Sequence, residues 1–262
     1  MSLSIFDLTG KTALLTGATH GLGMSMATGL AKAGARIIIN DISAEKLELA
    51  LKEYAENGIE VKGYLFDVTD EEAVKAAIGK IESEAGPIDI LVNNAGIIKR
   101  TPVIDMELAD WEAVIRIDLT GPFIMSKHVG KYMIERRSGK VINICSMMSE
   151  VGRETVSAYA AAKGGLKMFT KNLATEWAKF NIQVNGIGPG YFATTQTAPI
   201  RVDGHPFNEF ILSRTPAARW GEPEDLQGAT IFLSSKASDF VNGHILYVDG
   251  GILATLGKAS NE

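Results

Sequence analysis

The sequence has very little of what disulfide-bonded, metal-binding or membrane proteins need. It contains one cysteine, Cys145, and four histidines in 262 residues. One cysteine forms no internal disulfide, so a reducing cytoplasm is the expected setting. No His/Cys cluster has the spacing of a metal site, and no apolar run has the length of a membrane helix. The N-terminal residues also lack the basic and apolar regions of a secretory signal. We therefore expect a cytoplasmic protein that holds no metal.

An excess of positive charge is missing as well. The formal net charge of −5 argues against nucleic acid or an acidic membrane surface as a partner. The hydrophobic fraction of 46% and the charged fraction of 22% are those of an ordinary globular protein. Because no linker, repeat or low-complexity tract interrupts the chain, we expect residues 1–262 to form a single domain.

Apolar strand patterns alternate with helical patterns along the whole chain. Strands are predicted at residues 12–16, 36–41, 61–66, 88–92, 140–145, 182–187 and 244–248, with glycine and proline at 188–190 ending the sixth. A long helical region at 107–137 is expected to bend near Gly121 and Pro122. Such alternation predicts an α/β fold with a doubly wound parallel sheet of about seven strands and helices on both faces. Ligands of such sheets bind at the carboxyl ends of the strands.

A glycine-rich turn, TGATHGLG at residues 16–23, follows the first predicted strand and opens a helix. Gly17, Gly21 and Gly23 allow a ligand to approach the backbone, and the first N–H groups of the helix then face a pyrophosphate. The spacing departs from the commoner GxGxxG pattern, and a lone glycine cluster is weak evidence. Placed in a strand–helix–strand unit, it predicts a Rossmann-type dinucleotide site.

A second motif combines Ser146, Tyr159 and Lys163. Tyr159 and Lys163 are four residues apart in an Ala-rich segment, so a helix places them on one face. A lysine ammonium near a phenol favours the phenolate, which makes Tyr159 a general acid or base. Ser146 follows a predicted strand, where its hydroxyl can hydrogen-bond the oxygen of a carbonyl or alcohol. Taken alone, a Tyr-x-x-x-Lys pair is usually a chance feature of a helix surface; the glycine-rich turn makes oxidoreduction the better interpretation.

Taken together, these motifs resemble the short-chain dehydrogenase/reductase family along nearly the whole chain. The matching stretches also include NNAG at 93–96 and Pro189-Gly190 with Thr194. The resemblance implies that Ser146 positions the substrate oxygen, Tyr159 exchanges the proton, and Lys163 assists Tyr159 and binds the cofactor ribose. It also implies a homotetramer. The expected cofactor-binding residues are Gly17, Thr19, His20, Gly21, Leu22, Gly23, Asp41, Asp67, Val68, Asn94, Gly96, Tyr159, Lys163, Pro189, Gly190 and Thr194.

One position departs from the family pattern. The family usually carries asparagine in an NLxG-like motif before the fifth strand, whereas this chain has Asp118-Leu-Thr-Gly121. The resemblance implies that this asparagine holds a water that relays protons to the lysine, and Asp118 can hold a water as well. The aspartate also adds a negative charge that either helps to keep Lys163 protonated or forms a simple salt bridge. No catalytic role is therefore assigned to Asp118 from the sequence.

Within the family, the stretches NNAGIIKR, IGPGYFATTQTAP, HPF and TPAARWGEPEDL resemble those of enzymes that interconvert D-gluconate and 5-keto-D-gluconate. A substrate carboxylate calls for an arginine, and Arg100 and Arg153 are the candidates beside Ser146 and Tyr159. The alternative for each arginine is a solvated surface residue.

Residues 191–219 are expected to form a lid. The rival activities are C5 oxidation of 2-dehydro-3-deoxy-D-gluconate and reduction of 3-oxoacyl carriers. A non-catalytic nucleotide sensor would have no need of Ser146, Tyr159 and Lys163.

The cofactor is expected to be NAD, with NADP as the alternative. Asp41 ends the second predicted strand, where its carboxylate can accept hydrogen bonds from the adenosine ribose and repel a 2′-phosphate. His20 and Lys46 are the nearby cationic candidates that favour NADP. The structural alternative for Asp41 is a helix cap near Ser43.

Overall fold

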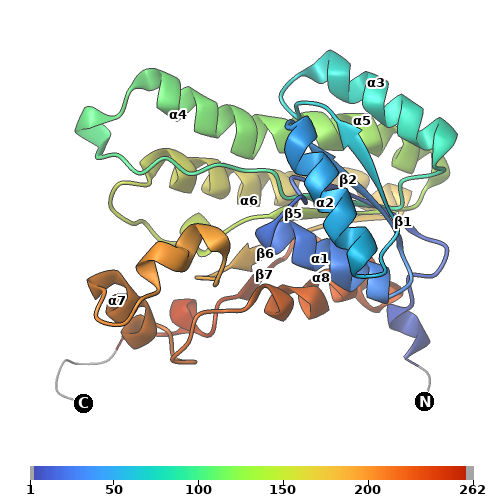
Figure 1. The fold of residues 1–262 in the computed structure, drawn as a ribbon. Helices are drawn as coiled ribbons and strands as arrows, with labels where there is room; N and C mark the ends of the chain where they lie inside the picture. The colour runs from blue at the N-terminus through green and yellow to red at the C-terminus, as the bar shows by residue number, and fades with distance from the viewer. Residues whose placement is uncertain (1–2, 258–262) are drawn as a thin grey trace.

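The computed structural model describes residues 3–257 and contains one parallel sheet in the order β3-β2-β1-β4-β5-β6-β7 (Figure 1). Residues 1–2 and 258–262 of the expected domain lie outside the described residues. The strands are β1 (Thr12–Thr16), β2 (Arg36–Asp41), β3 (Val61–Leu65), β4 (Ile90–Asn93), β5 (Gly139–Ile144), β6 (Ile182–Pro189) and β7 (Ile245–Val248). The α-helices are α1 (Gly21–Lys32), α2 (Ala44–Glu56), α3 (Glu71–Glu84), α4 (Leu108–Ile115), α5 (Gly121–Arg136), α6 (Ser157–Trp177), α7 (Pro206–Arg214) and α8 (Gln227–Ser234). The predicted doubly wound sheet is confirmed.

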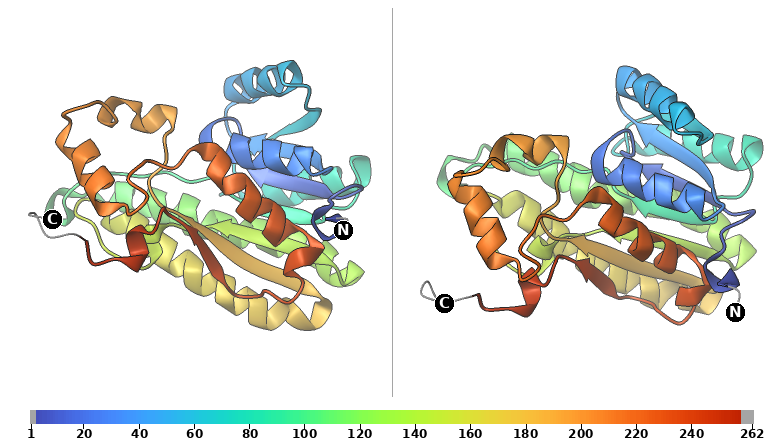
Figure 2. Two further views of the ribbon diagram at one scale, coloured as in Figure 1. Left: turned by 90° about the horizontal axis from the view of Figure 1, so that it is seen from below. Right: turned by 60° about the horizontal axis from the view of Figure 1, so that its bottom comes forward.

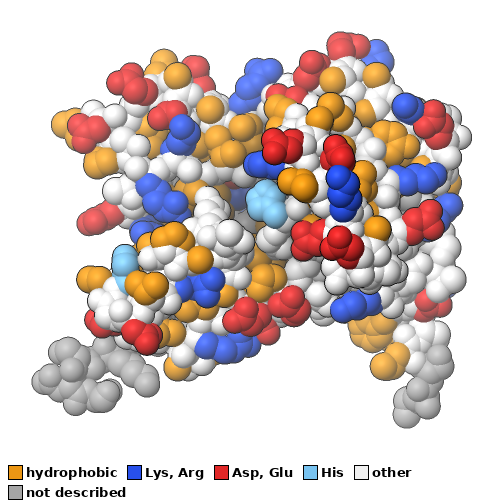
Figure 3. Space-filling view, in the orientation of Figure 1, with side chains coloured by type: hydrophobic (Ala, Val, Ile, Leu, Met, Phe, Trp, Pro, Cys, Tyr) orange, Lys and Arg blue, Asp and Glu red, His pale blue; other side chains and the backbone are white. Residues whose placement is uncertain are grey.

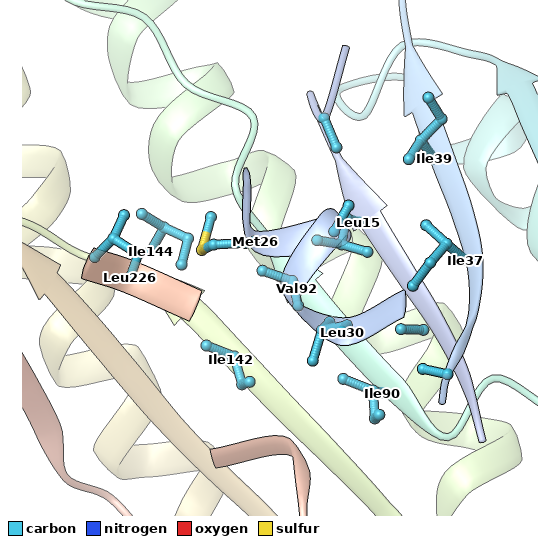
Figure 4. Close-up of a cluster of buried hydrophobic side chains, with 14 of the residues drawn as sticks. Leu15, Met26, Leu30, Ile37, Ile39, Ile90, Val92, Ile142, Ile144 and Leu226 are labelled. Atoms are coloured by element: carbon cyan, nitrogen blue, oxygen red, sulfur yellow. The ribbon is translucent and has the colours of Figure 1, made fainter. Parts of the chain in front are cut away.

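Alternating side chains of the central strands enter two separate hydrophobic cores. Leu15 and Val92 pack on one face of the sheet with residues of α1, α2 and α8 (Figure 4). Their neighbours Leu14 and Leu91 pack on the opposite face with residues of α3, α5 and α6. Because successive strand residues point to opposite faces, the middle of a strand buried on both sides is mostly apolar. This requirement explains the apolar runs at residues 13–15 of β1, 37–39 of β2 and 90–92 of β4.

The sheet reverses its direction of growth between β1 and β4. These two strands are hydrogen-bonded neighbours, while β2 and β3 extend the sheet on one side and β5, β6 and β7 on the other. The chains leaving β1 and β4 therefore diverge at the carboxyl edge. A crevice at such a reversal is where open α/β sheets bind their ligands.

Two predicted features need correction. Strand β6 does not end before Gly188: Gly188 and Pro189 pair with Tyr247 and Val248, and the absent Cβ of Gly188 leaves room for the Tyr247 ring. The helical region at 107–137 is interrupted before Gly121, by a π-helical turn at Arg116–Thr120. The expected lid, residues 191–219, includes α7, and His205 caps this helix by accepting from the Phe207 N–H at 3.1 Å. No described helix is long and apolar enough to cross a membrane.

Candidate active site

A cavity of about 620 Å³ opens at the carboxyl edge of the sheet. Figure 3 shows this face hollowed near its centre. In Figure 2 the orange segment that carries α7 stands across from α1 and α2. The cavity is lined by nearly all the predicted site residues: Gly17, His20, Gly21, Leu22, Gly23, Asp41, Asp67, Val68, Asn94, Gly96, Arg100, Ser146, Arg153, Tyr159, Lys163, Pro189, Gly190 and Thr194. Of the predicted set, only Thr19 is not part of the lining, and it contacts the site through Asp41.

The glycine-rich turn holds the start of α1 against the chain that leaves β4. Gly17 and Gly21 have positive φ angles of 61° and 56°. A Cβ on Gly17 would lie 2.9 Å from the Cα of Ala95. Asn94 fastens the two loops, because its Nδ2 donates to the carbonyl oxygens of Thr16 and Gly17 at 3.0 and 2.9 Å. The turn is thus fixed by close backbone packing that only glycine permits.

The amino end of α1 suits an anionic group. Its first residues, Gly21, Leu22 and Gly23, line the cavity, and the first N–H groups of a helix have no partner within the helix. The first turn contains no acidic residue, and no side chain caps it. This end of the helix therefore fits the pyrophosphate of a dinucleotide.

Asp41 lies at the end of β2 with both carboxylate oxygens engaged. Its Oδ2 accepts from the Thr19 hydroxyl at 2.7 Å, and its Oδ1 accepts from the Ser43 N–H at 2.8 Å. Ser43 itself caps α2 by accepting from the Lys46 N–H. A carboxylate has about four acceptor positions, so these two bonds hold Asp41 in place and leave it able to accept from a ligand. Asp41 therefore makes a structural contact beside Ser43, as the alternative to cofactor binding predicted. It also lines the cavity, where a cofactor can reach it.

Ser146, Tyr159 and Lys163 come together from two elements. Ser146 follows β5, and its Oγ accepts from the Met148 N–H at 3.1 Å. Helix α6 places Tyr159 and Lys163 one turn apart, with the Lys163 Nζ 5.5 Å from the centre of the Tyr159 ring. Lys163 is only 4% exposed, and its Nζ donates to the Ile144 carbonyl at 2.9 Å. The three side chains line one wall of the cavity.

Asp118 lies behind this group, fully buried. The π-helical turn directs its carboxylate inward, where Oδ2 lies 3.2 Å from the Lys163 Nζ and Oδ1 accepts from the Ile97 N–H at 2.8 Å. Burial raises the pKa of the Asp118 carboxyl, although the Lys163 ammonium and the Ile97 N–H oppose this effect. Burial also lowers the pKa of Lys163, but the neighbouring negative groups, Asp118 first among them, leave it above its usual value. The raised pKa of Lys163 keeps its ammonium charged at neutral pH, and the Asp118 carboxylate is its partner in a buried ion pair.

The two arginines expected to bind a substrate differ in their surroundings. Arg153 lies 4.2 Å above the centre of the Phe207 ring of α7, and its Nη1 donates to the Tyr191 hydroxyl at 3.4 Å. Arg100 is exposed at the cavity, and within residues 3–257 no hydrogen bond or ion pair engages it. Arg100 is therefore free to bind an anion. Arg153 instead connects the loop between Ser146 and Tyr159 to residues 191–219, the segment that carries α7.

Sequence reasoning did not single out several cavity residues. Met147, Met148 and Tyr191 line the cavity beside the residues expected to act. Their signal in the sequence is position alone: the methionines follow Ser146 directly, and Tyr191 follows Pro189-Gly190. Apolar and aromatic residues at such positions are indistinguishable from ordinary core residues until the fold is known.

Known proteins are similar to this chain in sequence and in fold. The sequence pattern of the family described as short chain dehydrogenase matches residues 11–204. The chain belongs to the short-chain dehydrogenase family. The resemblance inferred from the motifs is thus confirmed, and the chain is an oxidoreductase of this family.

Members of the short-chain dehydrogenase family with named activities are similar over their full length. A 2-dehydro-3-deoxy-D-gluconate 5-dehydrogenase of Formosa agariphila is 69% identical over 100% of both chains. A 5-keto-D-gluconate 5-reductase of Escherichia coli is 51% identical, over 96% of this chain and 99% of that one. The crystal structure of a gluconate 5-dehydrogenase from Burkholderia cenocepacia, in complex with NADP and tartrate, has a TM-score of 0.93. It is 45% identical and covers 98% of this chain and 100% of its own.

Proposed function

We propose that the protein interconverts a hydroxyl and a ketone at C5 of a gluconate-type sugar acid. The observation that carries this proposal is the group of Ser146, Tyr159 and Lys163 on the wall of a cavity that also contains the glycine-rich turn. This group supplies a proton donor and a hydrogen-bond donor for an alcohol or ketone oxygen. A non-catalytic sensor would need neither.

The chain's own residues handle the oxygen and its proton. A bound nicotinamide cofactor would supply the hydride in reduction and accept it in oxidation. The Ser146 hydroxyl hydrogen-bonds the substrate oxygen, and the Tyr159 hydroxyl gives its proton to that oxygen in reduction or takes the proton in oxidation. The Lys163 ammonium, buried beside the Tyr159 ring, favours the phenolate that proton donation leaves behind.

Two sugar acids are candidate substrates. The motifs favour D-gluconate with 5-keto-D-gluconate, an interpretation supported by the relative from Escherichia coli. The relative that is 69% identical supports 2-dehydro-3-deoxy-D-gluconate instead. Both acids carry a carboxylate, which the exposed Arg100 can bind with its planar guanidinium. Arg153 is the second predicted carboxylate ligand, and binding there would compete with its stacking on Phe207.

We also propose NAD as the preferred cofactor, with NADP as the alternative. The Asp41 carboxylate on the cavity wall would repel a 2′-phosphate. His20 and Lys46 line the same cavity and support NADP, as does the NADP complex of the relative from Burkholderia cenocepacia. We further propose a single domain in which residues 191–219 act as a lid, and a homotetramer in the cytoplasm.

The test is a spectrophotometric assay of purified protein with both cofactors and a panel of sugar acids, neutral polyols and acyl-carrier ketones. We expect turnover of at least one of the two sugar acids. Tyr159→Phe keeps the ring and removes the transferable proton, so turnover should fall at least ~100-fold, with cofactor binding retained. Near-normal turnover in this variant would disprove the role given to Tyr159.

A further inference from the structure

A buried carboxylate that the proposed chemistry does not use lies behind Lys163. Asp118 is 0% exposed and its Oδ2 lies 3.2 Å from the Lys163 Nζ. Within the described residues, Oδ2 accepts no hydrogen bond, so the ammonium is its principal neighbour. The absent Cβ of Gly96 makes room for this carboxylate, since a Cβ there would lie 2.9 Å from Oδ2.

We propose that Asp118 is a positioning residue that offsets the charge of Lys163 and thereby sets the pH range in which Tyr159 exchanges its proton. The lysine alone would strongly favour the phenolate of Tyr159. A carboxylate close to the ammonium makes the pair nearly neutral, so the phenol persists to higher pH. The protein is then ready to donate a proton, as reduction requires, at neutral pH, and it accepts one, as oxidation requires, under alkaline conditions.

Other charged groups nearby do not take over this task. Cys145, at the end of β5, is buried, which raises the pKa of its thiol to about 11, so it is neutral in this range. Glu150 is held by Lys167 and the Tyr247 hydroxyl, and Lys99 pairs with Asp110. The cavity wall also carries the carboxylates of Asp41 and Asp67 and four cations, Lys46, Arg100, Arg116 and Arg153. Within the described residues, Asp118 is the carboxylate that forms an ion pair with Lys163.

The variant Asp118→Asn removes the charge with almost no change in shape. An asparagine oxygen can still accept from the Ile97 N–H, so the loop contact is retained while the negative charge is lost. The matched control is Asp89→Asn, which removes one carboxylate from a Lys11 ion pair at the opposite, amino edge of the sheet. Circular dichroism and thermal melting establish that each variant is folded.

The readout is ultraviolet titration of the phenolate, which requires no substrate. The chain has six tyrosines, so the Tyr159 signal is isolated by subtracting the titration of the matching Tyr159→Phe protein in each background. In Asp118→Asn the phenolate should appear at lower pH than in wild type, because the Lys163 ammonium is no longer offset. It should appear at an unchanged pH in Asp89→Asn. The limb of the pH profile on which kcat/KM for oxidation rises with pH, because oxidation requires the phenolate, should move in the same direction.

Two outcomes would overturn the proposal. An unchanged midpoint would mean that the Asp118 charge does not affect the ionisation of Tyr159. A midpoint at higher pH would mean that Lys163 loses its proton when Asp118 is neutral. Asp118 would then maintain the charge of Lys163 and would not offset its effect on Tyr159. If Asp118→Asn does not fold, Asp118→Ser removes the same charge and is titrated in the same way. The proposal deepens the proposed function, but the titration decides it even if neither sugar acid is a substrate.

Discussion

Replacing Gly23 by alanine tests whether the glycine-rich turn is fixed by close packing. A Cβ at this position would lie 2.5 Å from the Asn94 Nδ2, 2.7 Å from the Gly17 carbonyl oxygen and 2.9 Å from the Ala18 Cα. Two of these atoms belong to the backbone and cannot rotate away. The added methyl group must therefore displace Asn94 or separate α1 from the chain that follows β4.

The cost follows from the contacts that would be lost. Asn94 donates two hydrogen bonds to the Thr16 and Gly17 carbonyl oxygens, each contributing about 1 kcal/mol. Forcing an extra carbon into a packed site adds about 1–3 kcal/mol. We therefore expect Gly23→Ala to reduce the free energy of unfolding by roughly 3–5 kcal/mol. For a chain of this size, the Tm should fall by roughly 10 °C.

Differential scanning calorimetry of the wild type and the variant measures this change. Gly228 provides the control: it lies in α8, and a Cβ there would meet no atom within 4 Å. Gly228→Ala should leave the Tm unchanged or raise it, because alanine is favoured over glycine in a helix by about 0.5–1 kcal/mol. An unchanged Tm in Gly23→Ala would refute the packing argument, since the site would then have room for a side chain.

Three further predictions concern the site. Arg100→Ala should raise the KM for gluconate far more than the KM for a neutral polyol, and Arg153→Ala should be compared in the same assay. Equal effects on both substrates would show that the arginine does not bind the carboxylate. Asp41→Ala should reduce the preference for NAD in initial rates at equal cofactor concentrations, and a wild-type preference for NADP would contradict the argument from charge. Burial raises the pKa of Cys145 from 9.0 to about 11. The folded state binds this proton more tightly, so its contribution to stability is complete below pH 9.0 and is lost as the pH rises to about 11. The fall in Tm over this range should be smaller in Cys145→Ala, and an equal fall in both proteins would contradict the assignment.

The sheet was predictable from the sequence because burial on both faces imposes a simple pattern. A short run of β-branched residues between polar ones, such as the three isoleucines of RIIIND, predicts a buried strand, and β2 has the predicted bounds, Arg36–Asp41. Helix ends were also predictable where a local side chain determines them. Ser43 and Asp70 cap α2 and α3 by accepting backbone N–H bonds three residues ahead.

The predictions that failed depend on contacts between distant segments. The sequence around Gly188 and Pro189 indicates a break, but pairing with Tyr247 and Val248 keeps these residues in β6. A π-helical turn at Arg116–Thr120 cannot be read from composition, because its residues are compatible with an ordinary α-helix. That turn decides whether Asp118 faces the solvent or the core.

Contacts between distant segments also distinguish the two arginines. Because such contacts cannot be read from the sequence, no role was assigned to Asp118 there. Motif positions placed Arg100, Arg153 and Asp118 near the site, and each lines the cavity. What a charge does there depends on its neighbours: Arg153 stacks on Phe207, Asp118 contacts Lys163, and Arg100 faces the open cavity. A buried carboxylate is costly unless it is paired with a cation, and the same holds for a buried ammonium. Asp118 and Lys163 therefore each stabilise the charged form of the other. The proton chemistry of Tyr159 therefore belongs to a group of three side chains, one of which lies outside the Tyr-x-x-x-Lys motif.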